Sequence, residues 1–315
     1  MVIVCAAATL GAACSTLIRG GAVEAGSGHS TPITNMCVAR PTNRGGIIGP
    51  STPWAGPASN QPPPRYSAET IGGIEVWVPA QYTAAQDGEV AILFASQTLG
   101  NETFRGSLER LMVAGIMPPT FLVSGGGIDW AEASDASGST IASRAERLET
   151  LLKAVKARYP KLSSAANMHA LAGHSTAGAV AFDLAWARPD LFGKVLGVSA
   201  SFEAFQRWLF PYPTNIDARN KDKVRLALSV AECDLVHPPA LVPRACHETC
   251  SSGTCICVGC DKGNWVQSNQ AAAQKLIALG YQTQLLIIRG GQHDSVNMGN
   301  IDGLTYLWRD VVCPN

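Results

Sequence analysis

The sequence predicts an α/β fold with a largely parallel central sheet. From about residue 66 onward, short apolar runs alternate with segments whose apolar residues recur at helical spacing, and this alternation continues over about 250 residues. The chain has 315 residues, of which 46% are hydrophobic, so it can bury a sizeable core as one large or two small domains. In such folds, functional groups gather at the carboxyl ends of the strands.

The expected elements follow one another in a regular order. Strands are predicted where short apolar runs end at Gly, Pro or polar residues: 74–78, 90–95, 120–124, 168–172, 194–199, 224–230 and 283–288. Helices are predicted between them: 104–114, 141–159, 179–187, 202–208 and 265–279. No internal repeat interrupts this order.

The amino-terminal part has a different composition. Residues 1–19 contain an apolar stretch ending in small residues, which is typical of a signal peptide, although no Lys or Arg precedes it; an ordinary apolar leader or a truncated start is the alternative. Residues 20–65 are rich in Gly, Pro and Ser and are expected to be a tail or linker. The folded domain is expected over 66–315. No apolar run reaches the length of about 18–20 residues that a membrane helix requires, so no membrane span is expected.

Charge and cysteine content narrow the class of protein. Lys+Arg and Asp+Glu both number 24, which argues against a surface that binds nucleic acid. Five of the ten cysteines lie in the insertion 237–262, at positions Cys246, Cys250, Cys255, Cys257 and Cys260. Their crowded spacing fits a zinc site poorly and favours disulfides over metal or free thiols, so we expect an oxidising, secreted location and no bound metal.

The strongest single motif is the run Gly173-His174-Ser175-Thr176-Ala177-Gly178. It joins a predicted strand to a predicted helix, so Ser175 is expected on a tight turn with its hydroxyl exposed. The backbone N–H of Thr176 and the positive end of the helix would face an oxyanion. The alternative is a serine that merely caps a helix after a glycine-rich turn.

A nucleophilic serine needs a base and an acid, and both follow in the chain. The last predicted strand ends in a glycine-containing loop that carries His293, the predicted base. The strand before it ends in a loop with Glu232 and Asp234, either of which is placed to orient the base. The other histidines of the domain lie in the elbow, in a strand or in the cysteine-rich insertion and are expected to be structural: His174, His169, His237 and His247.

Several segments together resemble the esterase family that includes enterochelin esterases and feruloyl or acetyl xylan esterases, relatives of esterase D. The resemblance spans about residues 66–310 and rests on residues 76–82, 172–178, 188–194, 263–265 and 290–293. It implies an α/β-hydrolase fold, a three-layer sandwich, and hydrolysis of carboxylic esters without a metal or cofactor. It implies Ser175 as nucleophile, His293 as base and Asp234 as acid, with Glu232 the close alternative. It also implies a second oxyanion donor near Ser96 or Gln97.

The sequence therefore predicts a serine esterase that acts through an acyl-enzyme on a small-molecule or carbohydrate ester, sugar-linked, aryl or siderophore-like. Two alternatives stay open. The same acyl-enzyme can be resolved by an alcohol, which would make the protein an acyltransferase. A non-catalytic binding protein with this fold is the other alternative.

Overall fold

The computed structural model describes residues 46–48, 66–82, 90–124, 130, 139–202, 216–234, 247–251, 254–258, 265–293 and 301–312. The chain divides into two units, Met1–Arg40 and Pro41–Asn315, and every described residue belongs to the second. The predicted signal peptide lies outside the described residues, and so does the predicted tail apart from residues 46–48.

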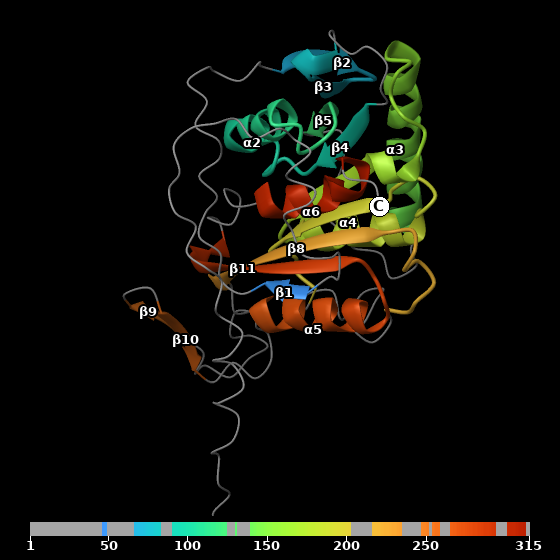
Figure 1. The fold of residues 1–315 in the computed structure, drawn as a ribbon. Helices are drawn as coiled ribbons and strands as arrows, with labels where there is room; N and C mark the ends of the chain where they lie inside the picture. Colours follow the sequence, from blue (N-terminus) through green and yellow to red (C-terminus); the bar gives the residue numbers. More distant parts are fainter. Residues whose placement is uncertain are drawn as a thin grey trace, which may run out of the picture. The chain divides into compact units, whose positions relative to one another are not determined.

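A nine-stranded sheet forms the centre of the second unit, in the order β1-β11-β8-β7-β6-β4-β5-β3-β2 (Figure 1). The strands are β1 (Gly46–Ile48), β2 (Ser67–Ile71), β3 (Ile74–Val78), β4 (Ala91–Ala95), β5 (Thr120–Ser124), β6 (His169–His174), β7 (Lys194–Val198), β8 (Arg225–Cys233) and β11 (Thr283–Gln292). All neighbours pair in parallel except β2 with β3 and β3 with β5. A separate antiparallel ribbon joins β9 (His247–Ser251) to β10 (Thr254–Val258).

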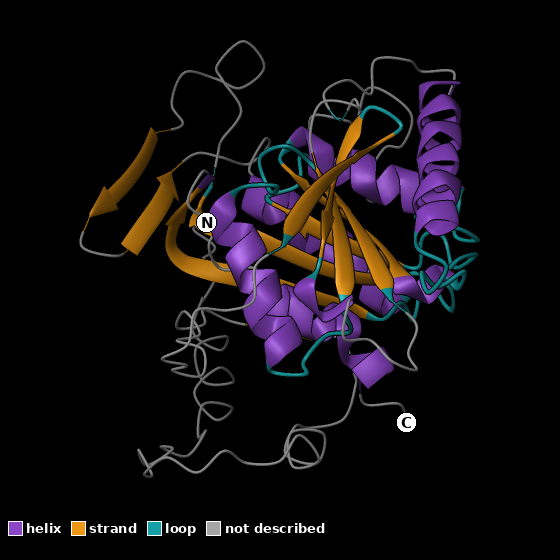
Figure 2. Cartoon of the chain, turned by 90° about the horizontal axis from the view of Figure 1, so that it is seen from above, coloured by secondary structure: helices purple, strands orange, loops and turns teal. Residues whose placement is uncertain are grey.

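Helices cover both faces of the sheet, which makes three layers (Figure 2). The helices are α2 (Glu102–Val113), α3 (Ser139–Arg158), α4 (Thr176–Ala187), α5 (Trp265–Ala278) and α6 (Ile301–Val312), with short 3₁₀ turns η1 (Ala80–Tyr82) and η2 (Ala166–Met168). The apolar side chains of α3, α4 and α5 share one buried cluster, and those of α2 and α6 share another. The fold class expected from the alternation of strands and helices is thereby confirmed.

Successive side chains of a strand point to opposite faces of the sheet, so each strand contributes to both buried clusters. In β4, Ile92 and Phe94 belong to the first cluster, whereas Leu93 between them belongs to the second. All five residues of β4 are buried because helices cover both faces. A strand that is buried on both faces has a continuous apolar sequence, which is why β4 could be predicted from the sequence.

The structure adds elements that the sequence analysis did not predict. Strand β1 lies inside the segment expected to be a tail, and it pairs in parallel with β11 at the edge of the sheet. Strand β2 and helix α6 were not predicted either, although α6 carries apolar residues at helical spacing and buries Leu304, Leu307 and Trp308. The helix predicted over 202–208 lies almost wholly outside the described residues.

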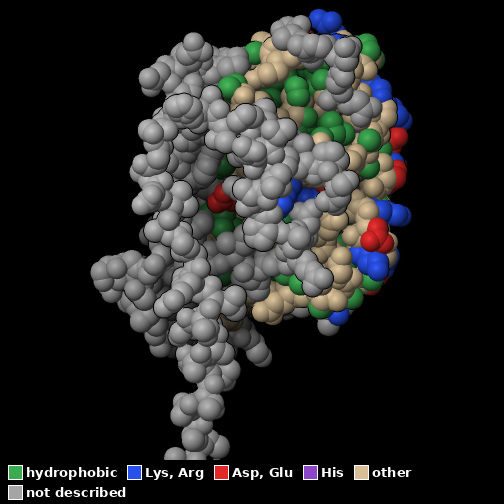
Figure 3. Space-filling model, viewed as in Figure 1, with side chains coloured by type: hydrophobic (Ala, Val, Ile, Leu, Met, Phe, Trp, Pro, Cys, Tyr) green, Lys and Arg blue, Asp and Glu red, His purple; other side chains and the backbone are tan. Residues whose placement is uncertain are grey.

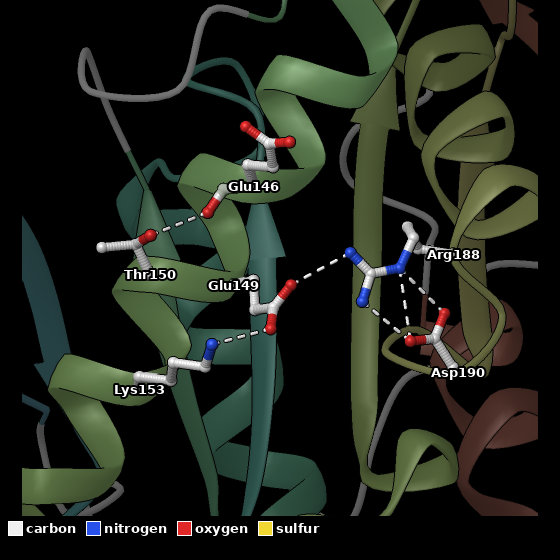
Figure 4. A network of polar contacts seen from close by, with 6 residues as sticks. All are labelled: Glu146, Glu149, Thr150, Lys153, Arg188 and Asp190. Atoms are coloured by element: carbon white, nitrogen blue, oxygen red, sulfur yellow. Dashed lines mark hydrogen bonds and ion pairs between the residues drawn. The ribbon is translucent and has the colours of Figure 1, made fainter.

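An ion network on the outside of the domain ties α3 to the end of α4. The Arg188 guanidinium donates to the carboxylate of Asp190 and, 3.0 Å away, to Glu149, which also pairs with Lys153 (Figure 4). Because these hydrogen bonds favour the charged forms, the pKa of Arg188 is raised and that of Asp190 is lowered. Side chains of both charge signs lie along the edge of the molecule that carries α3 (Figure 3).

None of the helices in the described part of the chain combines the length and the apolar character that crossing a bilayer requires.

Candidate active site

Ser175 lies on a strained turn between β6 and α4. Its backbone has φ 60° and ψ −128°, a region that non-glycine residues rarely enter. The turn is held from both sides, because Ser175 N–H donates to the Val198 carbonyl at 2.9 Å and the Ser175 carbonyl accepts from Gly178 N–H at 3.0 Å. The side chain makes no capping hydrogen bond to α4, so the reading of Ser175 as a mere helix cap is not supported by the geometry.

The small residues around the turn are required by close backbone contacts. A Cβ atom on Gly173 would lie 2.0 Å from the Ala177 carbonyl oxygen, and one on Gly178 would lie 2.9 Å from the Ala200 Cβ. Real Cβ atoms do not approach other atoms this closely, so both glycines are needed for the helix to begin directly behind the strand. Steric contacts therefore explain why glycine occupies both positions of the motif.

Asp234 and His293 are joined by a hydrogen bond. The distance from His293 Nδ1 to Asp234 Oδ1 is 2.6 Å, and the Asp234 side chain is fully buried while His293 is 13% exposed. Since a carboxylate only accepts hydrogen bonds, the proton of the neutral imidazole lies on Nδ1. The Nε2 lone pair is then free to accept a proton, which is the tautomer that a general base requires.

The sheet register explains why these two residues meet. Strands β8 and β11 are neighbours, and Gln292 of β11 pairs with Cys233 of β8 after a register shift between Ile288 and Gln292 (Figure 1). His293 and Asp234 are the next residues on the two strands and therefore lie side by side. Nothing is described of the side chain of Glu232, the alternative acid, so the hydrogen bond is evidence for Asp234 alone.

Two aromatic rings contact the His293 imidazole. The ring of His174 lies 4.6 Å away between centroids, tilted by 42°, and the ring of Trp265 lies 4.7 Å away, edge-on at 89°. His174 also donates from Nε2 to the His293 carbonyl oxygen at 3.0 Å. Because His174 precedes Ser175 in the chain, it brings the loop that carries His293 against the elbow, although no hydrogen bond joins Ser175 to His293 in the described part of the chain.

The remaining histidines fall as follows. His169 lies in β6 with Nδ1 2.8 Å from the Leu191 carbonyl and Nε2 2.9 Å from the Ser163 carbonyl, which makes it a buried structural residue as expected. His237 lies outside the described residues, and the His247 side chain is not described. The backbone of the cysteine-rich insertion places Cys250 opposite Cys255 in the β9–β10 ribbon, but the predicted disulfides involve side chains that the structure does not describe.

The loop after β4 contains the two backbone groups expected near an oxyanion. Ser96 N–H donates to the Ala172 carbonyl at 2.9 Å, so this donor is already used. Gln97 N–H makes no hydrogen bond among the described residues, and the turn is closed by Leu99 N–H donating to the Ser96 carbonyl at 2.9 Å. Of the two N–H groups that the sequence left open, only that of Gln97 makes no hydrogen bond within the described part of the chain.

Other features of the described residues do not compete with this site. A cavity of about 480 Å³ is lined by α3 and by the turn before β3, including Gly72, Ile74 and Arg144, and none of Ser175, Asp234 and His293 lines it. Ser175, Asp234 and His293 are the better candidate for the active site than the cavity, because they combine a nucleophile with a histidine in the tautomer that a general base requires. Within the described ranges, no three His, Cys, Asp or Glu residues are grouped in a way that would hold a metal ion.

The sequence matches the model of a known protein family. Residues 145–292 match the model of the esterase family, described as "Putative esterase", over a little less than half of the chain. The matched segment contains Ser175 and Asp234 and ends one residue before His293. No curated relative matches the sequence.

Solved structures share the fold at low sequence identity. A ferulic acid esterase has a TM-score of 0.55 and 14% identity, covering 78% of this chain and 96% of the other. Enterochelin esterase from Shigella flexneri has a TM-score of 0.52 and 17% identity, and the match covers 82% of this chain but only 61% of that longer one. An IroE-like serine hydrolase from Shewanella oneidensis has a TM-score of 0.53 and 16% identity, covering 78% and 81%.

At such identities these structures establish the α/β-hydrolase fold, while the family match adds the class of reaction. The resemblance drawn from the sequence motifs is thereby confirmed: residues 145–292 match the esterase family model and esterase structures share the fold, which supports a carboxylic ester hydrolase.

Proposed function

We propose that the protein hydrolyses its ester through a serine acyl-enzyme, with Ser175 as nucleophile, His293 as general base and Asp234 as the acid that orients His293. The observation that carries the proposal is the 2.6 Å hydrogen bond between Asp234 Oδ1 and His293 Nδ1, beside a serine held at φ 60°. A buried carboxylate in this position orients the imidazole and stabilises the imidazolium cation that forms when the imidazole takes the serine proton.

The first half-reaction forms the acyl-enzyme. Ser175 Oγ attacks the ester carbonyl carbon while His293 Nε2 takes the hydroxyl proton, and the carbonyl oxygen becomes an oxyanion. When the tetrahedral intermediate collapses, the bond to the leaving alkoxide breaks and His293 returns the proton to it as the alcohol departs. Asp234 stays ionised throughout and stabilises the imidazolium.

The second half-reaction repeats these steps with water. His293 takes a proton from water, the hydroxide adds to the acyl carbon, and collapse returns the proton to Ser175 as the acid leaves. In both halves the oxyanion would accept hydrogen bonds from the backbone N–H of Thr176, at the positive end of α4, and from the N–H of Gln97.

The proposed substrate is a sugar-linked, aryl or siderophore-like ester. The name of the ferulic acid esterase, which shares the fold, supports an ester of an aromatic acid as the first compound to test, and the name of the enterochelin esterase supports enterochelin as the second. Pocket loops rather than the fold decide substrate choice, so the substrate class has to be measured.

The test combines labelling with a substrate panel. Purified wild-type protein and Ser175→Ala are treated with a fluorophosphonate probe and assayed on p-nitrophenyl, feruloyl and acetyl-sugar esters. We expect labelling and turnover in wild type, and loss of both in Ser175→Ala with an unchanged unfolding temperature. The loss of turnover should reach several orders of magnitude.

Two results would contradict the proposal. If the folded wild-type protein is not labelled and cleaves no ester, a binding protein with this fold becomes the better description. If Ser175→Ala retains activity within about tenfold of wild type, Ser175 is not the nucleophile. Added alcohol separates hydrolysis from acyl transfer, since a transferase would give the new ester in preference to the free acid.

A further inference from the structure

We propose that Ser199 is a positioning residue of this site, whose hydroxyl holds the Asp234 carboxylate in the orientation that His293 requires. The proposal rests on the proposed function, because positioning the acid matters to turnover only if His293 is the base. It assigns a role to a residue that the sequence analysis treated only as the end of a strand.

The contact comes from neighbouring strand ends. Ser199 follows β7 directly, and its N–H donates to the Ser229 carbonyl of β8 at 2.7 Å. This extends the β7–β8 pairing and brings Ser199 to the end of β8, where Asp234 lies. The Ser199 hydroxyl donates to Asp234 Oδ2 at 2.5 Å, and both residues are buried, with 0% and 1% of their surfaces exposed.

The two oxygens of the Asp234 carboxylate accept hydrogen bonds from different donors. Oδ2 accepts from the Ser199 hydroxyl and, at 3.3 Å, from the Ala231 N–H, whereas Oδ1 accepts from His293 Nδ1. A carboxylate bound at one oxygen alone could turn about its Cβ–Cγ bond. Donors on both oxygens fix its plane, and they also replace the water that the buried charge has lost.

The backbone of Ser199 is a second, independent observation. Its φ is +44°, and among the described residues other than glycine only Ser175 and Ser199 have positive φ. Glycine would adopt this conformation without strain, so a serine here carries a cost that needs a compensating gain. The hydroxyl bond to Asp234 supplies that gain, just as the strained turn at Ser175 exposes the nucleophile.

Ser199→Gly is the sharpest test because it removes the hydroxyl and relieves the backbone strain at once. We expect kcat on a p-nitrophenyl ester to fall about 10- to 100-fold, the size expected for one hydrogen bond to a charged group, with KM changed less than about twofold. The unfolding temperature should change little, because relief of strain opposes the lost bond. Ser199→Ala, which keeps the strain, is the second variant in case glycine perturbs the loop.

A matched control lies two residues further along the same loop. Ser201 is also buried, with 1% of its surface exposed, but its hydroxyl has no hydrogen-bond partner among the residues that the structure describes. Ser201→Ala should therefore keep kcat within about twofold of wild type.

The pH dependence of kcat/KM provides a readout that a purely structural role would not change. His174 and Asp234 are the titratable side chains seen to face His293 in the described structure. Losing the Ser199 donor disfavours the ionised carboxylate, so protonation of the Asp234–His293 pair becomes easier and the acid limb should move to higher pH. In an Asp234→Asn background, Ser199→Gly should have little further effect on kcat.

The outcomes separate this proposal from the function on which it rests. If Asp234→Asn abolishes turnover but Ser199→Gly keeps wild-type kcat and an unchanged pH profile, Ser199 does not position the acid and the esterase mechanism stands. A loss confined to KM or to the unfolding temperature also overturns the positioning role. If Asp234→Asn itself is nearly fully active, the proposed acid fails first.

Discussion

Asp234→Asn tests the role of Asp234 as the acid that orients His293. The substitution keeps the shape of the side chain but replaces one acceptor oxygen by an amide NH₂, which only donates. Ala231 N–H donates to the Oδ2 position and the Ser199 hydroxyl donates there as well, so the amide oxygen should settle at that position. The NH₂ then occupies the Oδ1 position, where it faces His293 Nδ1 at hydrogen-bond distance.

This arrangement reverses the tautomer of His293. To accept from the new NH₂, Nδ1 must lose its proton, which moves to Nε2, and a protonated Nε2 cannot take the proton of Ser175. The variant also loses the negative charge that stabilises the imidazolium. We expect kcat to fall by about 10³- to 10⁴-fold, which corresponds to about 4 to 5.5 kcal/mol of transition-state stabilisation.

The assay is steady-state hydrolysis of a p-nitrophenyl ester at pH 7 to 8, with kcat and KM determined separately. Far-ultraviolet circular dichroism and thermal unfolding check that the variant folds. KM should change little, because Asp234 is buried behind His293 and does not face the substrate.

Glu232→Gln is the matched control, since Glu232 lies two residues before Asp234, near the end of β8, and was the alternative acid. It should cost less than about tenfold in kcat. If the two results are reversed, Glu232 is the acid and the reasoning from the hydrogen bond is refuted. If neither variant loses activity, the enzyme works with Ser175 and His293 alone.

Further predictions address the oxyanion donor, the elbow and the core. Gln97→Pro removes the backbone N–H at the second position of a turn, where proline fits. We expect kcat to drop about 10²- to 10³-fold, whereas Gln97→Ala should stay near wild type. Equal activity of both variants would exclude this donor. Gly173→Ala should leave little folded protein by circular dichroism, because its Cβ would lie 2.0 Å from the Ala177 carbonyl oxygen; a wild-type melting curve would contradict this. Burial lowers the pKa of Lys194 to about 8, although its partner Asp310 opposes the shift. Above pH 8 the folded state then binds fewer protons than the unfolded state, so the free energy of unfolding rises with pH. Measured by urea unfolding, the difference in this free energy between wild type and Lys194→Met should increase by about 2 kcal/mol from pH 7.5 to 9.5. A constant difference would refute the shifted pKa.

The sequence by itself determined the elements whose signal is local. Strands β3 and β5 have the bounds that were predicted. All five residues of β5 are buried, so it appears as an apolar run, whereas β3 interrupts its apolar residues with the exposed Glu75 and ends at a proline. The elbow around Ser175 also has a local signal, since a Cβ on Gly173 would meet the Ala177 carbonyl oxygen four positions away, whereas Gly178 is also required by its contact with Ala200 of a different strand end. His293 was found because it is a histidine at a strand end, where an α/β fold collects its functional groups.

Other elements carry no such local signal. The three residues of β1 form a strand only because β11 offers an unpaired edge, and composition alone placed them in a tail. The pairing of Asp234 rather than Glu232 with His293 depends on the register of β8 against β11, including its irregularity after Ile288.

The tertiary structure alone decided how the site is supported. Ser199 and Asp234 lie 35 residues apart in sequence, and their hydrogen bond arises because β7 and β8 are neighbours in the sheet. The proposal of Gln97 as second oxyanion donor rests on the hydrogen bond that Ser96 N–H donates to β6, which pairs with β4 although a long connection separates them in sequence. Hydrogen bonds of this kind depend on strand order and register, and these are set by the packing of the whole domain rather than by any short stretch of sequence.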